Sequence, residues 1–474
     1  MKIKFFFLFV IVANTTASAQ GIFVNSPYLQ IGNHTSANSM QVLWHAAPVN
    51  AEWKLEYRSA EQKNWTANDT IYFNTVAVEG IAAHRVYHAG ITHLIAGSQF
   101  SYRIWNNGKI VFTADAQAVK KADQSYRFVA FGDIGAEKPD QKRLAVQAFK
   151  AKPDFVVVPG DIVYENGLIS EYNQKFWPVY NADKLNDSAA PIMRSVPFIA
   201  AVGNHDADNR DLDKFPDALA YYLFWDQPLN GPLGKEGGTL VPVLKGSDAH
   251  KKAFIDAAGA TYPRMANFSF DYGNAHWTVL DADTYVDWTD KELTDWVAKD
   301  LSASRDAVWH FVMFHHPGFN SSREHYEQQQ MRLLSPIFEA GKVDVVFNGH
   351  AHNYQRSYPL LFIPDKKGTL LVGGKDNKIV RGRVVNGRWV LDKTYDGKTN
   401  TTANGIIYIV TGAGGQELYN PEQEADSDSW QKFTYKFIST LHSLTVADVD
   451  GKSLTIRQVS AEGKEIDSFK LTKK

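Results

Sequence analysis

The stretch Val343–Arg356, VDVVFNGHAHNYQR, has the composition of a buried strand that ends in two histidines. Its first half is rich in valine, and a short apolar run bounded by glycine is typical of a strand inside a sheet. The run stops at Gly349, and His350 and His352 follow with one residue between them. Ligands of α/β proteins bind at the carboxyl ends of the strands. The stretch therefore predicts two imidazoles at a ligand-binding edge.

Four further predicted strands lie upstream and end in a similar way. Each is a short run of β-branched and aromatic residues. A helical pattern over Lys138–Ala151 lies between two of them, and another over Glu324–Ala340 leads to the strand at Val343. Strands and helices in alternation predict a layered α/β domain. The sequences at these strand ends are GDIG at 132–135, GDIVY at 160–164, GNHD at 203–206 and HHP at 315–317.

The polar residues at the strand ends belong to the types that bind metal ions. A Gly-Asp pair alone is often a turn or a helix cap, and a single histidine is more often structural than a ligand. Five strand ends in one domain that all offer Asp, Asn or His are better explained by a metal site. Two carboxylates, one amide, three imidazoles and one phenol exceed the needs of one ion, so we expect two ions with Asp161 between them. Oxygen and nitrogen ligands without thiolate suit iron, manganese or zinc.

The part of the chain before this domain has a different pattern. Residues 22–117 contain short runs of alternating apolar and polar residues, with Asn107-Gly108 as a hairpin turn between two of them. This pattern predicts an all-β sandwich. Residues 115–125 are polar and predict a linker. The second domain is expected over 125–474, with insertions near 207–262 and 360–403, and the first insertion is expected at the rim of the site.

The first residues have the pattern of a secretory signal peptide over residues 1–19. A basic start at Lys2 and Lys4, the apolar run Phe5–Ala13 and the small-residue site Ala17–Ala19 follow one another. We therefore expect a secreted or periplasmic protein. The 474-residue chain contains no Cys, which leaves neither a disulfide nor a lipidated cysteine. A net charge of −2 without a basic block argues against nucleic acid as a partner, and no later apolar run predicts a membrane span.

The motifs GDIG, GDIVY, GNHD, VMFH and GHAH, in this order, resemble those of the calcineurin-like metallophosphoesterases. Tyr164 within GDIVY resembles the purple acid phosphatases among them. The resemblance spans nearly all of the chain after the signal peptide, apart from the two insertions. Each motif alone is weak, whereas the set of five is specific. The resemblance implies an α/β fold, namely a four-layer αββα metallophosphoesterase domain preceded by a fibronectin-type-III-like sandwich.

The resemblance also implies how the motif residues divide between two ions. The first ion, ferric in this family, would be bound by Asp133, Tyr164 and His352. The second ion, Fe, Zn or Mn, would be bound by Asn204, His315 and His350. Asp161 would bridge the two ions. A phenolate ligand requires a strongly charged ion, because the pKa of free tyrosine is ~10. His316 would either lie behind the ligands or be unrelated to the site.

The substrate-facing histidines of the family fall on His205 and His325. A further histidine, expected directly before His325, is replaced by Glu324, whose carboxylate would repel phosphate unless it is protonated or turned away. This departure leaves open whether His205 or His325 protonates the leaving group. Arg323 either binds phosphate through two parallel hydrogen bonds (bidentate binding) or is an ordinary exposed loop residue.

The expected function is that of a secreted phosphatase that hydrolyses phosphate monoesters by attack of a metal-bound hydroxide. A phosphodiesterase or nucleotide pyrophosphatase with the same metal centre is the alternative, because the motifs do not determine the shape of the rim. A third hypothesis is a non-catalytic surface binding module, against which the complete ligand set with His205 and His325 argues. The expected partner is a small phosphorylated substrate, and the sandwich is either a scaffold or a homodimer contact.

Overall fold

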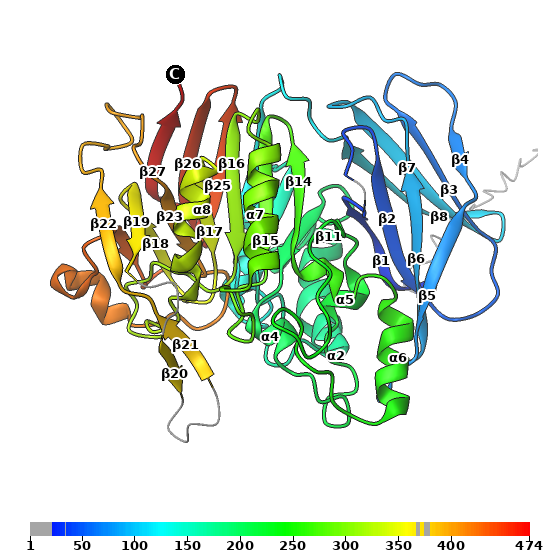
Figure 1. Cartoon of the computed structure of the whole chain (residues 1–474). Helices are drawn as coiled ribbons and strands as arrows, with labels where there is room; N and C mark the ends of the chain where they lie inside the picture. The colour runs from blue at the N-terminus through cyan, green and yellow to red at the C-terminus, as the bar shows by residue number, and fades with distance from the viewer. Residues whose placement is uncertain (1–20, 34, 366–369, 374–379) are drawn as a thin grey trace, which may run out of the picture.

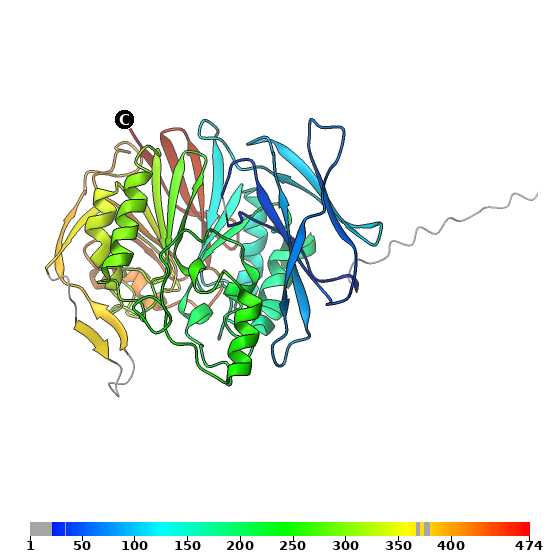
Figure 2. The same cartoon turned by 45° about the vertical axis from the view of Figure 1, so that its right-hand side comes forward.

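The computed structural model describes residues 21–474 except 34, 366–369 and 374–379 (Figure 1). The segment predicted as a signal peptide lies outside the described residues. Figure 1 shows an all-β part, coloured blue to cyan, beside a larger part in which strands and helices alternate, and Figure 2 shows the same two parts from another side. Within the described residues, every helix is too short or too polar to cross a membrane.

The N-terminal part consists of two four-stranded antiparallel sheets. One sheet has the order β1 (Phe23–Gln30), β2 (Met40–Ala46), β6 (His84–Ile91) and β5 (Ile71–Val76). The other has the order β4 (Thr66–Asn68), β3 (Trp53–Ser59), β7 (Gln99–Asn106) and β8 (Lys109–Gln117). Inward-facing residues of both sheets, such as Trp44, Leu55 and Tyr102, form one buried core. The predicted all-β N-terminal fold is confirmed.

The second part contains two larger sheets. The six-stranded sheet has the order β13 (Phe198–Ala201), β10 (Phe155–Pro159), β9 (Tyr126–Ala130), β25 (Ser443–Asp450), β26 (Ser453–Ser460) and β27 (Glu465–Thr472). The seven-stranded sheet has the order β14 (Phe268–Tyr272), β15 (Ala275–Leu280), β16 (Trp309–Phe314), β17 (Val345–Asn348), β23 (Ile407–Thr411), β18 (Tyr354–Ser357) and β24 (Thr434–Ile438).

An aromatic layer joins these two sheets. The ring of Phe128 on β9 lies 5.0 Å from that of Trp277 on β15 and 5.6 Å from that of Phe347 on β17. Helix α1 (Pro139–Lys150) buries Leu144 and its neighbours on the outer side of the six-stranded sheet. Helix α7 (Lys291–Ala303) packs against β15 on the outer side of the other sheet. The predicted α/β fold of layers αββα is therefore confirmed.

Parallel strands in both sheets present their carboxyl ends at one edge. Strand β10 lies parallel to β9 and β13, and β16 lies parallel to β15 and β17. The loops that leave β9, β10, β13, β16 and β17 carry the motifs at residues 132–135, 160–164, 203–206, 315–317 and 349–352. The topology thus collects residues that are far apart in the sequence.

Two predictions of local structure differ from the structure. The helix predicted over 324–340 is wrong for its first part, because 324–329 is a loop in which His325 has a left-handed φ of 58°. A 3-10 turn (Gln330–Leu334) and helix α8 (Ser335–Ala340) follow. The segment 207–262 is not only a rim excursion, because Tyr221 and Phe224 are fully buried in the core of the domain.

The segment 207–262 also links the two parts of the molecule. The Tyr28 hydroxyl of β1 donates to the Phe224 carbonyl at 2.8 Å, and both groups are buried. Helix α6 (Asp248–Ala258) packs against β5 of the sandwich. The sandwich is thereby attached to the domain through a backbone carbonyl and a helix of the segment 207–262.

A buried histidine on β15 makes the stability of the domain depend on pH. His276 lies 2.8 Å from Asp271 and 3.0 Å from Asp300, one carboxylate at each ring nitrogen. Burial alone would lower the pKa of His276, but hydrogen bonds to Asp271 and Asp300 outweigh it and raise the pKa to about 9. A histidine with a raised pKa stabilises the fold fully below its unfolded pKa of ~6.5, and this contribution is lost as pH rises through the folded value.

We therefore expect the melting temperature of the protein to decrease between pH 6.5 and 9 by more than that of the His276→Gln variant. The difference corresponds to up to about 3 kcal/mol. Thermal unfolding of both proteins in a pH series measures it. Parallel melting curves over this range would contradict the assignment.

Candidate metal centre

The loops at the sheet edge bring all seven predicted metal ligands into two adjoining clusters. The first cluster surrounds the Tyr164 hydroxyl. Its oxygen lies 2.9 Å from Asp133 Oδ1, 3.0 Å from Asp161 Oδ2 and 3.1 Å from His352 Nε2. His352 Nε2 is also 3.4 Å from Asp133 Oδ1. Four predicted ligand atoms from three different loops therefore converge on one point.

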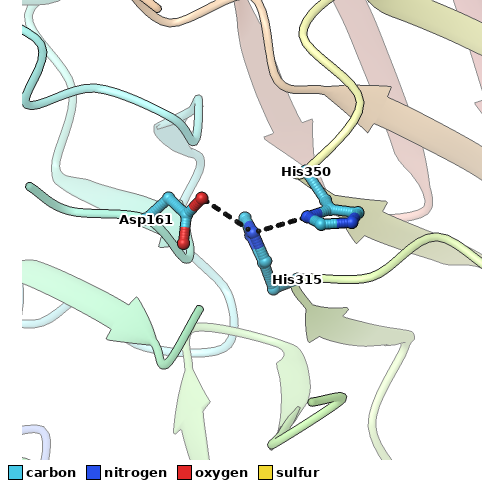
Figure 3. Close-up of side chains that lie close together, drawn as sticks. All are labelled: Asp161, His315 and His350. Carbon is cyan, nitrogen blue, oxygen red and sulfur yellow. Dashed lines mark hydrogen bonds and ion pairs between the residues drawn. The ribbon is translucent and has the colours of Figure 1, made fainter. Parts of the chain in front are cut away.

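The second cluster surrounds the Nε2 atom of His315. This nitrogen lies 3.1 Å from Asp161 Oδ2, 3.2 Å from Asn204 Oδ1 and 3.2 Å from His350 Nδ1. Ligand atoms of Asp161, His315 and His350 all lie within 4.8 Å of one another (Figure 3). Asp161 Oδ2 contacts both the Tyr164 hydroxyl and His315 Nε2, so this one oxygen joins the two clusters.

The chemistry of the two clusters fits metal cations. Asp133 and Asp161 are 0% and 1% exposed, and a buried carboxylate is stable only when a positive charge or several hydrogen bonds compensate it. Burial, followed by the charges of Asp133 and Asp161, raises the pKa of Tyr164 well above its usual value of 10.0. A phenolate at this position therefore requires a strongly charged cation beside it.

The imidazole rings of the clusters are oriented by groups behind them. Nδ1 of His315 donates to the Pro159 carbonyl at 2.8 Å, and Nδ1 of His352 donates to the Glu417 carbonyl at 2.8 Å. Because a carbonyl only accepts, the Nε2 atom of each ring is left with a free lone pair toward the cluster. His350 is turned the other way, because its Nε2 is hydrogen-bonded to Gln328 Oε1 and its Nδ1 faces the cluster.

The backbone of the motif loops allows the carboxylates and imidazoles of the two clusters to lie close together. Asp133, Asp161 and His350 have left-handed φ values of 61°, 52° and 67°, a conformation that costs energy in residues other than glycine. A Cβ atom at Gly203 would lie only 2.3 Å from Asp161 Oδ1, and one at Gly349 only 2.8 Å from Asp133 Oδ2. The glycines of GNHD and GHAH therefore leave the space that the carboxylates occupy.

His205 lies at the open side of the clusters. Its backbone N–H donates to Asp161 Oδ1 at 3.0 Å, and Nδ1 donates to the Glu165 carbonyl at 2.7 Å. Its Nε2 is 3.9 Å from Asp161 Oδ2, and its side chain is 28% exposed. Burial lowers the pKa of His205, but the charge of Asp161 and the Glu165 carbonyl outweigh this effect and raise it.

His325 lies beside the second cluster. Its ring is 4.0 Å from that of His350, measured between centroids. Burial, followed by the charges of His352 and His315, lowers the pKa of His325 to about 4. The two substrate-facing histidines of the sequence analysis thus flank the clusters in opposite electrostatic surroundings.

Arg323 and Glu324 lie at the rim. The side chain of Arg323 is 58% exposed and forms an ion pair with Glu422 at 3.1 Å. This position favours the exposed-loop alternative over the phosphate clamp. Glu324 is exposed, and its backbone carbonyl accepts a hydrogen bond from Asn320 Nδ2.

His316 lies behind the predicted ligands, which is one of the two positions that the sequence analysis considered for it. Its ring is 4.0 Å from that of His350, and its Nε2 is 3.6 Å from Asp283 Oδ1. His350 is therefore held between the rings of His316 and His325.

Sequence reasoning missed three residues that shape the site. Asp206 accepts from the backbone N–H of Gly203 at 3.0 Å and of Ile162 at 3.1 Å, which ties two motif loops together. It is part of the GNHD motif, so the motif itself was a signal for it. Gln328 and Tyr419 contact His350 and His352, respectively, but lie in segments without a recognisable pattern.

Comparisons with known proteins agree with this geometry. The family model described as calcineurin-like phosphoesterase matches residues 126–354, the span that contains all seven clustered residues. The chain is 25% identical over 354 residues to "Probable inactive purple acid phosphatase 27" of Arabidopsis thaliana. This alignment covers 66% of this chain and 52% of the relative. It is 26% identical over 283 residues to "Purple acid phosphatase 1" of Ipomoea batatas, in an alignment that covers 57% of this chain and 52% of the relative. The chain thus spans about half the length of these curated relatives.

Two solved structures share the fold. Purple acid phosphatase PPD1 from yellow lupin has a TM-score of 0.63 at 18% identity and covers 95% of this chain and 75% of its own. A structure of PhoD has a TM-score of 0.56 at 13% identity and covers 94% of this chain and 92% of its own. The match over 126–354, the relatives and the shared fold lead to one conclusion: residues 126–354 form a calcineurin-like phosphoesterase domain, and the chain is similar to purple acid phosphatases in sequence and in fold.

Proposed function

We propose that this protein is a secreted phosphatase that hydrolyses phosphate monoesters at a centre of two metal ions, one Fe(III) and the other Fe, Zn or Mn. The observation that carries the proposal is the position of Asp161 Oδ2, which joins the cluster around Tyr164 to the cluster around His315. A carboxylate oxygen shared by two sets of ligands is the arrangement that a two-metal hydrolase requires.

The residues of each cluster have separate tasks in this proposal. Asp133, Tyr164 and His352 would hold the ferric ion, and Asn204, His315 and His350 would hold the second ion. Ions bound here supply a water activated for attack and neutralise the charge of the phosphate. The phenolate of Tyr164 and the two carboxylates balance the positive charge within a buried site.

The two flanking histidines serve the substrate. Nδ1 of His205 donates to the Glu165 carbonyl, so the opposite nitrogen, Nε2, is directed to the open side of the clusters. A protonated His205 would donate from Nε2 to the oxygen of the leaving alcohol. His325 lies on the side of the second cluster and offers a further hydrogen bond to the phosphate. No side-chain nucleophile is needed.

The names of several relatives include the word inactive, so it matters whether this chain has every residue that the proposed metal centre requires. In this chain all seven ligand positions carry residues suited to metal binding, and His205 and His325 flank them. A structural metal site needs no such flanking histidines. This arrangement supports catalysis over a non-catalytic surface binding module.

We expect the purified protein loaded with iron and zinc to hydrolyse an aryl phosphate monoester and to lose this activity when a chelator removes the metal. Metal analysis and a phosphate-release assay over a pH series measure both effects. The corresponding bis-aryl diester is the control, and faster cleavage of the diester would favour the phosphodiesterase alternative. A protein that retains two ions per chain and cleaves neither ester would contradict the proposal.

A further inference from the structure

Tyr419 is a residue at the metal centre to which the proposed function assigns no task. Its ring stacks on that of the ligand residue His352, with 4.0 Å between centroids and 14° between planes. The edge of the same ring faces His325 at 5.6 Å. Tyr419 therefore lies over one ligand residue and beside one substrate-facing histidine.

The loop that carries Tyr419 is hydrogen-bonded to His352 and to the loop that contains His325. The Tyr419 N–H donates to the His352 carbonyl at 3.0 Å. The next residue, Asn420, accepts hydrogen bonds at Oδ1 from the Ser322 hydroxyl at 2.8 Å and from the Glu324 N–H at 3.4 Å. The phenol is thus held in place before any substrate binds, and such preorganisation reduces the entropic cost of a contact.

The hydroxyl of Tyr419 is free to bind a ligand. Among the residues that the structure describes, no hydrogen bond joins this hydroxyl to another group. A tyrosine hydroxyl with its ordinary pKa of ~10 is protonated at neutral pH and can donate a hydrogen bond. The hydroxyl of Tyr164, by contrast, is occupied by three ligand residues.

We propose that Tyr419 is a substrate-binding residue, whose hydroxyl donates a hydrogen bond to an oxygen of the phosphate ester at the metal centre. This inference rests on the proposed function. Glu324 stands where the family resemblance predicts a substrate-facing histidine. Tyr419 offers a hydrogen-bond donor beside that position. A phenol donates to phosphate without adding a positive charge to a centre that would hold two cations.

The test compares Tyr419→Phe with the wild type and with Tyr435→Phe. Phenylalanine keeps the ring that stacks on His352 and removes only the hydroxyl. Tyr435 lies on β24 and makes an edge-to-face contact with Tyr358, outside the clusters, so its variant is the matched control. Three quantities are measured for each metal-loaded protein: the metal content, the Kd for inorganic phosphate by calorimetry, and kcat/KM for an aryl phosphate.

We expect Tyr419→Phe to weaken phosphate binding and to lower kcat/KM by about 10- to 100-fold each, with an unchanged metal content. Tyr435→Phe should match the wild type. Wild-type values for phosphate binding in Tyr419→Phe would overturn the inference, and so would a loss of metal in this variant, because Tyr419 would then only position His352. If the wild type binds phosphate without hydrolysing the ester while Tyr419→Phe binds it more weakly, the inference stands and the proposed function falls.

Discussion

Replacing Asp161 with asparagine is expected to reduce hydrolysis of an aryl phosphate by about 1,000-fold or more while the protein remains folded. Asp161 Oδ2 is the atom that contacts both the Tyr164 hydroxyl and His315 Nε2. A carboxamide offers one neutral oxygen where the carboxylate offers two charged ones, so it cannot bridge two cations with the same strength. The backbone N–H of His205 would also lose its charged acceptor, Asp161 Oδ1.

The matched control for this variant is Asp344→Asn. Asp344 is half-buried just before the strand that leads to the GHAH motif, and it contacts Lys473 at 2.7 Å and the His310 N–H at 2.9 Å. Its replacement should lower the stability of the protein but leave the hydrolysis per folded molecule intact. Steady-state rates, metal content and circular dichroism of both variants separate the two effects. Near-normal turnover in Asp161→Asn would refute the bridging role.

Replacing Tyr164 with phenylalanine is expected to abolish the visible absorption of the iron-loaded protein. The hypothesis is that the colour arises from charge transfer between the Tyr164 phenolate and Fe(III). The geometry supports this assignment, because the hydroxyl of Tyr164 lies within 2.9 to 3.1 Å of atoms of Asp133, Asp161 and His352. Phenylalanine retains the buried ring but offers no oxygen to the ion.

The control for the spectrum is Tyr172→Phe. Tyr172 is also fully buried, but its hydroxyl accepts a hydrogen bond from Trp225 Nε1 and does not touch the clusters. The visible band should persist in this variant, with a small loss of stability. A band of unchanged position and intensity in Tyr164→Phe would show that another group is responsible for it, and iron analysis of each sample confirms equal loading.

The sequence pattern predicted the fold well where the local signal and the tertiary role coincide. The valine-rich strand before His350 and the alternating strands of the sandwich are examples, because burial on one face or on both faces directly determines which residues a strand contains. The prediction failed in the segment 324–329, where a helical pattern continues across a loop. There the contact of His325 with His350 and a left-handed backbone override local propensity.

The sequence by itself determined which residues are the predicted metal ligands and in which order they occur, because the motifs at five strand ends are local and a parallel sheet places such ends at one edge. Only the tertiary structure decided which ring nitrogen faces the clusters, since Pro159, Glu417 and Gln328 act from distant segments. It also decided the place of Tyr419, whose loop has no motif and is positioned by Asn420, Ser322 and His352. Contacts of this kind depend on the packing of remote segments, which no local pattern in the chain encodes.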